Sequence, residues 1–181
     1  NKKASSIWER DYMYTKLRTV VKDAAINDEG VMYVRYSDED GAPVNEVINK
    51  NDIYYGNEND EDIQSQPYIL LKQRKPVSEV KLIAGALGVS EKEIEHIIGD
   101  MDNIEEAGEA AKYEKDNMCT VVTKLYKKDG TVHFAQATRT VDLKKDINTG
   151  LRYYPVAHFV WEEKKGSARG EGEVRHCLLY T

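Results

Sequence analysis

The sequence has few cysteines, no long apolar run and no excess of basic residues. Two cysteines, Cys119 and Cys177, are too few for a disulfide framework. No apolar stretch approaches the roughly 20 residues that a membrane helix requires, and the polar N-terminal residues do not form the apolar region of a signal peptide. Acidic residues outnumber basic ones and give a net charge of −6, which argues against a general nucleic-acid-binding protein.

What remains is the composition of a soluble, folded protein. Hydrophobic residues make up 40% of the 181 residues and charged residues 32%. A chain of this length can bury a substantial core as one domain of ordinary size. Cys119 lies in an apolar pattern, so we expect a small buried thiol there, which fits a reducing cytoplasm.

Alternating apolar and polar residues predict a sheet of mostly antiparallel strands. The Lys-Lys-Asp-Gly sequence at residues 127–130 is the strongest hairpin signal, because Asp-Gly suits the tight turn between two strands. A turn is also predicted at residues 146–150. The predicted strands cover residues 31–36, 44–48, 53–55, 68–73, 119–126, 131–137, 139–143 and 156–161.

Three helices are predicted beside these strands. Ser6 and Glu9 have the spacing of a capping box, which predicts an amphipathic helix from there to about Ala25. A helix from Pro76 to Gly88 and a shorter one from Ser90 to Gly99 form an insertion. The predicted fold class is therefore α+β, a mostly antiparallel β meander with an N-terminal amphipathic helix and a small two-helix insertion.

We expect residues 1–181 to form a single domain with three parts. Residues 1–75 and 117–165 supply the helix and the antiparallel sheet. Residues 76–116 supply the helical insertion, whose acidic part after Asp100 is expected to be a loop or a loosely held helix. Residues 166–176 are expected to be a hinge that leads into a further helix.

The hinge prediction rests on a glycine-rich segment between a strand and a helix start. Gly166, Gly170 and Gly172 surround Arg169, and acidic residues follow where a helix N-terminus favours them. These glycines are the predicted hinge, and valine at the last two is expected to leave the fragment folded but to disturb assembly. The core at the root of the hinge is expected to be Tyr154, Phe159 and Trp161.

This segment resembles the end of the wing region in portal proteins of tailed phages, in the branch common among phages of Gram-positive hosts. The resemblance rests on the Tyr-Pro-Val strand at residues 154–156 and on the Gly-Ser-x-x-Gly-x-Gly-Glu-Val segment at residues 166–174. It extends upstream through residues 24–30, 53–60 and 66–69.

The sequence departs from the family pattern near its end. In the family, an apolar pair, a Pro-Asn-Gln-like step and a long stem helix follow the hinge. Here residues 177–181 read Cys-Leu-Leu-Tyr-Thr. We therefore expect a wing fragment without the stem, clip and crown of a portal.

The resemblance implies a structural protein of the virion that is present in the host cytoplasm during assembly. Portal subunits form a ring at one capsid vertex, through which DNA is packaged and ejected without sequence specificity. The implied partners are other portal subunits, the terminase, and the capsid and head-completion proteins, but no membrane. The resemblance implies no enzymatic activity, since the terminase hydrolyses the ATP.

Two other functions remain open on the residues alone. Residues 77–99 have the spacing of a helix-turn-helix DNA reader, although the second helix presents Glu91, Glu93 and Glu95, which phosphates would repel. The glycine-rich segment with Arg169 lies between a strand and a helix, a position suited to an anion or nucleotide, but it lacks the Walker and dinucleotide patterns.

No catalytic, cofactor or metal site is expected. The acidic residues 57–62 lack the glycine and glutamate spacing of a calcium loop, so a solvated loop is expected there. The four histidines have no Cys or His partner at the spacing of metal ligands, and they are His96, His133, His158 and His176.

Overall fold

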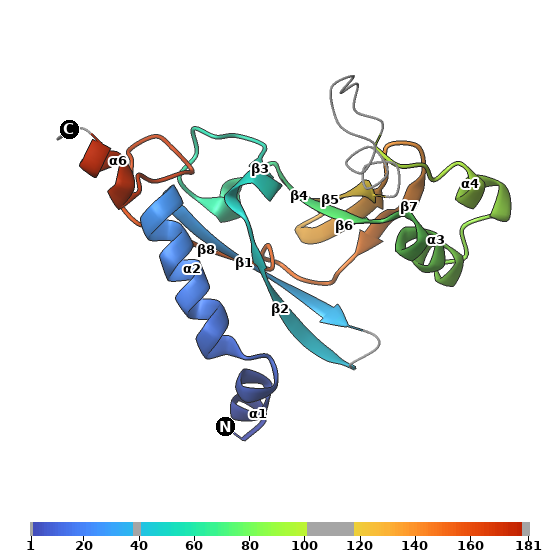
Figure 1. Ribbon diagram of the computed structural model, residues 1–181, viewed down its shortest axis with the longest axis horizontal. Helices are drawn as coiled ribbons and strands as arrows, with labels where there is room; N and C mark the ends of the chain where they lie inside the picture. Colours follow the sequence, from blue (N-terminus) through green and yellow to red (C-terminus); the bar gives the residue numbers. More distant parts are fainter. Residues whose placement is uncertain (1, 38–40, 101–117, 179–181) are drawn as a thin grey trace, which may run out of the picture. The chain divides into compact units, whose positions relative to one another are not determined.

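The computed structural model describes residues 2–37, 41–100 and 118–178 (Figure 1). The acidic stretch after Asp100, expected to be a loop or loose helix, lies outside these residues. The chain divides into two compact units, which we describe separately. Unit 1 is Asn1–Ile69 with Tyr153–Thr181, and unit 2 is Leu70–Arg152. The single domain and the three parts expected from the sequence stay a prediction.

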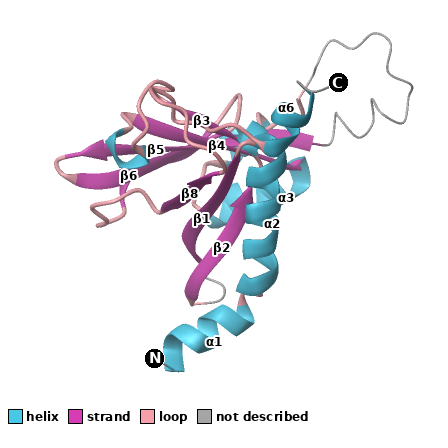
Figure 2. Ribbon diagram, turned by 90° about the vertical axis from the view of Figure 1, so that its left-hand side faces the viewer, coloured by secondary structure: helices cyan, strands magenta, loops and turns pink. Residues whose placement is uncertain are grey.

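Unit 1 is a three-stranded antiparallel sheet with helix α2 packed on it (Figures 1 and 2). The strand order is β2-β1-β8, and Val31 of the central strand pairs with Ile48 on one side and His158 on the other. The helices of this unit are α1 (Lys2–Arg10), α2 (Met13–Asn27) and α6 (Glu173–Leu178). The strands are β1 (Glu29–Ser37), β2 (Ala42–Ile48), β3 (Ile53–Tyr55) and β8 (Val156–Val160), and the 3₁₀ turns are η1 (Lys50–Asp52) and η2 (Ile63–Ser65).

The N-terminal helix differs from the prediction in its start and its continuity. Helix α1 already begins at Lys2, so the Ser6 capping box does not start it. The helix breaks at Tyr12, whose backbone is left-handed with φ of 49°. The break is held by Asp11, whose carboxylate accepts hydrogen bonds from Lys16 Nζ at 2.5 Å and from the backbone N of Asn45 at 2.8 Å. The sequence pattern missed it because the bond to Asn45 joins residues far apart in the chain.

Helix α2 lies unusually close to strand β1. Val20 and Ala24 are its buried residues, and a Cβ on Gly30 would lie 2.2 Å from the carbonyl oxygen of Val20. Only glycine allows the helix and the strand to approach so closely. No helix among the described residues has the length and apolar character needed to span a membrane.

Unit 2 contains most of the second sheet, whose strand order is β3-β4-β5-β6-β7. The predicted hairpin turn is confirmed, since Asp129 and Gly130 have φ of 51° and 76°, as a type I′ turn requires. The predicted turn at residues 146–150 begins too early, because strand β7 continues to Asn148 with a positive φ of 41° at Asp146. The chain leaves the strand only at residues 149–150, where Gly150 has φ of 72°. The strands that follow β3 are β4 (Tyr68–Pro76), β5 (Met118–Lys128), β6 (Thr131–Ala137) and β7 (Asp142–Asn148).

The two-helix insertion is α3 (Val77–Ala86) and α4 (Glu91–Glu95). Gly88 ends the first helix with φ of 77°, and the predicted capping box between Ser90 and Glu93 is present. Helix α4 ends four residues before the predicted end at Gly99. Both helices contact the core of unit 2, which includes Val80, Ala84, Ile97, Cys119, Val121, Val141 and Leu143. The α+β fold class predicted from the sequence is confirmed.

Candidate functional site

The candidate site is the loop between β8 and α6, together with the residues of unit 1 that hold it. The loop returns to its own start, since the backbone N of Glu171 donates to the carbonyl of Glu162 at 2.9 Å and the reverse bond is 3.2 Å. Farther out, the N–H of Ala168 donates to the carbonyl of Glu58 at 2.8 Å, and that of Gly166 donates to Glu61 Oε1 at 2.5 Å. The loop is therefore fixed at both its base and its tip.

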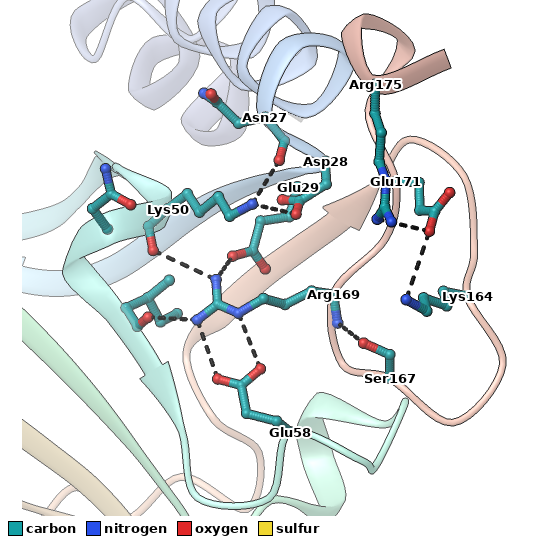
Figure 3. A network of polar contacts seen from close by, with 12 residues as sticks. Asn27, Asp28, Glu29, Lys50, Glu58, Lys164, Ser167, Arg169, Glu171 and Arg175 are labelled. Atoms are coloured by element: carbon teal, nitrogen blue, oxygen red, sulfur yellow. Dashed lines mark hydrogen bonds and ion pairs between the residues drawn. The ribbon is translucent and has the colours of Figure 1, made fainter. Parts of the chain in front are cut away.

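Arg169 is the centre of this arrangement (Figure 3). Its guanidinium forms a two-pronged pair with Glu58, with Nε donating at 3.0 Å and Nη2 at 3.2 Å. Nη2 also donates to the carbonyl of Ile53 at 2.9 Å, and Nη1 pairs with the Glu29 carboxylate. Burial by itself lowers the pKa of Arg169, yet the hydrogen bonds to Glu58 and the charge of Glu29 hold that pKa above its ordinary value. Paired and fork-shaped contacts of this kind fix the side chain in one orientation.

Glu29 is the buried partner of Arg169 and joins four segments of unit 1. Its side chain is 0% exposed, against 20% for the Arg169 side chain. Tyr55 Oη donates to Glu29 Oε2 at 2.8 Å, and His158 Nε2 lies 3.0 Å from the same oxygen. Burial, with the nearby Glu29 carboxylate, holds the pKa of Tyr55 well above its ordinary value. The Glu29 carboxylate thereby ties β1, β3, β8 and the loop together.

The last part of the loop packs against the C-terminus of α2. A Cβ on Gly172 would lie 2.9 Å from both the backbone N of Asp28 and the carbonyl oxygen of Ile26. A Cβ on Gly170 would lie 2.5 Å from the carbonyl oxygen of Glu162. These two glycines are needed because no larger residue fits, and α6 begins directly after them in contact with α2.

Lys50 binds the same C-terminal end of α2 (Figure 3). Its Nζ donates to the carbonyl of Asn27 at 2.8 Å and pairs with the Asp28 carboxylate. A cation at this position also interacts favourably with the negative end of the helix dipole. Asp28 itself has φ of 111°, and its carbonyl accepts the N–H of Trp161 at 2.9 Å.

The structure places the predicted hinge residues in different surroundings. Gly166 has a positive φ of 69° with open space around it, whereas Gly170 and Gly172 are buried against backbone. Their action as a hinge stays a prediction.

Of the three residues predicted at the hinge root, Tyr154 is buried and its Oη donates to the carbonyl of Gln66 at 2.9 Å. Phe159 and Trp161 are 44% and 38% exposed, so they lie outside the core of the described residues. The inward face of β8 carries Val156 and His158 instead.

Sequence reasoning missed Glu29, Tyr55 and Glu58 as functional candidates. Glu58 and Glu61 belong to the segment expected to be a solvated loop, but their oxygens bind the glycine-rich loop. Gln66, 2% exposed, holds the same segment from inside, with its side-chain amide bonded to Asn57 and Asp60. The signal available in the sequence was that Glu29, Tyr55 and Glu58 lie in the segments that carry the resemblance.

The two alternative functions were DNA reading by residues 77–99 and anion or nucleotide binding at the glycine-rich segment. The contacts of the residues concerned add no support for either function. Beside the loop, an open groove of about 730 Å³ lies along β8, lined among others by His158, Phe159, Lys164 and Arg169. The Arg169 guanidinium already pairs with two carboxylates. The candidate recognition helix α4 spans Glu91–Glu95 and exposes its three glutamates.

A second polar cluster lies in unit 2 around Asp146. Its carboxylate accepts hydrogen bonds from Tyr126 at 2.6 Å and Lys128 at 2.7 Å, and His133 Nδ1 lies 2.5 Å away. These bonds hold the pKa of Asp146 well below its ordinary value. The cluster fastens β7 to β5 and β6. Among the residues that the structure describes, no group of His, Cys, Asp and Glu side chains is arranged to hold a metal ion.

The chain was compared with known proteins by sequence. No protein-family model matches it, and no curated protein matches it either.

Proposed function

We propose that the chain is a wing fragment of a portal subunit of a tailed phage. One observation carries the proposal beyond the resemblance itself. Three of the separate segments that resemble the family, residues 24–30, 53–60 and 166–174, meet at the Glu29–Arg169 pair. The other two, residues 66–69 and 154–156, bind each other through Tyr154 and Gln66, and residues 66–69 also bind residues 53–60. These segments are far apart in the sequence, yet they all resemble the same family. Their contact within one structural element explains why the resemblance includes all of them.

In this role, the loop is a fixed joint between the body of the subunit and a helix that starts at α6. A joint that carries load needs contacts that hold several elements at once. Arg169 supplies them by binding Glu29 of β1, Ile53 of β3 and Glu58, and Gly172 sets α6 against the end of α2. The direction of α6 is then determined by α2 and the sheet.

The proposal also includes the partners and the location of such a subunit. It would meet other portal subunits, the terminase, and capsid and head-completion proteins, and phage DNA would pass through the ring without being read. It would be found in the virion, and in the host cytoplasm during assembly. It would carry no active site and need no cofactor, since the terminase supplies the energy of packaging.

Electron microscopy of the complete product of the gene that encodes this chain tests the proposal. We expect closed rings with a central channel. The Arg169→Met variant of that product is expected to give fewer or irregular rings, because its joint is loosened. Arg35→Met, which removes an exposed ion pair with Glu46 in the same unit, is the matched control and is expected to give normal rings. A complete product that forms no ring would contradict the proposal.

A further inference from the structure

Helix α2 exposes a second row of apolar residues besides the row that it buries. Val20 and Ala24 are buried. Tyr14, Leu17 and Val21 are 69%, 37% and 48% exposed. Their spacing of three and four residues places them on one face of the helix. An exposed apolar row of this kind on a helix is typical of a surface that binds another protein.

Basic side chains border this row. Arg18 and Lys22 are exposed, and the Arg18 guanidinium lies 6.0 Å from the centre of the Tyr14 ring. Helix α2 carries three basic residues and one acidic residue, in a chain whose net charge is −6. Residues Tyr14, Leu17, Arg18, Val21 and Lys22 are called the α2 patch below.

The two-helix insertion of unit 2 also exposes large apolar residues. Leu82 on α3 is 77% exposed, and Ile98, just after α4, is 49% exposed. Leu82 lies one turn before Gly85 on α3, and Ile94 Cδ1 of α4 would lie 3.9 Å from a Cβ on Gly85. Leu82 therefore borders the side of α3 on which α4 lies.

This second surface is acidic. Helix α4 contains three glutamates and one lysine. Glu91 and Glu95 are exposed and lie one turn apart on the same side of the helix. Glu91, Glu95, Leu82 and Ile98 are called the α3–α4 patch below.

We propose that the α2 patch of one copy of this chain docks on the α3–α4 patch of a second copy. Both patches combine exposed apolar residues with charge, and their charges are opposite. Pairing of two α2 patches would bring basic residues together, and pairing of two α3–α4 patches would bring glutamates together, so both symmetric pairings are disfavoured. The charges thus favour a head-to-tail contact between copies.

A head-to-tail contact leaves one patch of each kind open at the two ends of a pair. Further copies can then add, and the assembly becomes a ring if the rotation closes or a filament if it does not. The inference deepens the proposed function by naming the surfaces where neighbouring subunits meet. It rests on that function only for the expectation that the assembly closes into a ring.

Two variants that each lack one patch test the contact. Leu17→Ser with Val21→Ser removes the α2 patch, and Leu82→Ser with Ile98→Ser removes the α3–α4 patch. In sedimentation experiments, each variant alone is expected to stay monomeric, and their mixture is expected to form a 1:1 heterodimer and nothing larger. The unaltered chain is expected to form larger species as its concentration rises. A control that removes two other exposed apolar residues, Ile147→Ser with Leu151→Ser, is expected to associate like the unaltered chain.

Reversal of the charges tests the pairing itself. Arg18→Glu with Lys22→Glu is expected to weaken association about tenfold at low salt, and adding Glu91→Lys with Glu95→Lys is expected to restore it. An unaltered chain that stays monomeric at all concentrations, a mixture without heterodimer, or a charge swap without rescue would overturn the docking. Heterodimers of the chain variants, together with open filaments but no rings of the complete gene product, would uphold the docking and reject the portal function. Rings of that complete product that are indifferent to the patch variants would do the reverse.

Discussion

Replacing Arg169 by methionine is expected to lower the free energy of unfolding by about 3 kcal/mol. The physical reason is that the variant leaves the Glu29 carboxylate, 0% exposed, buried without its cationic partner. Urea unfolding followed by tryptophan fluorescence measures this, because both tryptophans, Trp8 and Trp161, belong to unit 1.

The expected loss of stability is large because the Arg169–Glu29 ion pair is buried. A control variant at an exposed ion pair tests this explanation. Arg35→Met removes an arginine that pairs with Glu46 at 2.5 Å, but its side chain is 43% exposed. We expect that variant to lose about 0.5 kcal/mol, as exposed ion pairs typically do. Equal losses for the two variants would contradict the account of Arg169.

A double variant separates the ion pair from simple loss of packing. Glu29→Gln combined with Arg169→Met removes the unpaired charge while the amide can still meet Tyr55 and His158. The double variant is therefore expected to recover at least half of the stability that Arg169→Met loses. A double variant whose loss is the sum of two large single losses would mean that the pair is not coupled.

Replacing Gly170 by alanine is expected to lower the free energy of unfolding by about 2 kcal/mol, because the added methyl group overpacks a closed space. The new Cβ would lie 2.5 Å from the Glu162 carbonyl oxygen and 2.9 Å from Val160 Cβ. Either the β8 end or the loop must then move. The sequence-based expectation that valine at Gly170 or Gly172 leaves the fragment folded is revised by this geometry, since valine is larger still.

Gly166 is the control that distinguishes lack of space from backbone conformation. It has a positive φ of 69° and nothing within 4 Å of a Cβ. Alanine at Gly166 is expected to lower the free energy of unfolding by about 1 kcal/mol, because the backbone there is left-handed. Asparagine is expected to lower it less, because asparagine tolerates that conformation. At Gly170 the order should reverse, with asparagine worse than alanine. The same order at both positions would contradict the packing explanation.

The strand pattern was predictable because local alternation is recorded in neighbouring residues. The strand at residues 131–137 and the Asp129–Gly130 turn needed no information from elsewhere in the chain. Asp146 shows the limit of this reasoning. Its Asp-Ile-Asn-Thr-Gly context is typical of a turn, but bonds from Tyr126 and Lys128 hold it within strand β7.

The site was only partly predictable. The glycines and Arg169 stand out by local composition, so the loop could be located from the sequence. Its partners could not, because Glu29 is 140 residues from Arg169 in sequence and Glu58 is 111 residues away. Local patterns predict a hinge where glycines gather, whereas burial and ion pairing, which fix this loop, depend on which segments meet in space.

Hydrogen exchange of the loop amides tests the central claim most directly, namely that the loop is a fixed joint. The N–H groups of Ala168 and Glu171 donate to the carbonyls of Glu58 and Glu162 at 2.8 and 2.9 Å. We expect both amides to exchange as slowly as those of strand β1, and to become fast in Arg169→Met. Exchange in the unaltered chain at the rate of an unstructured peptide would contradict the claim, and would leave the segment a free hinge.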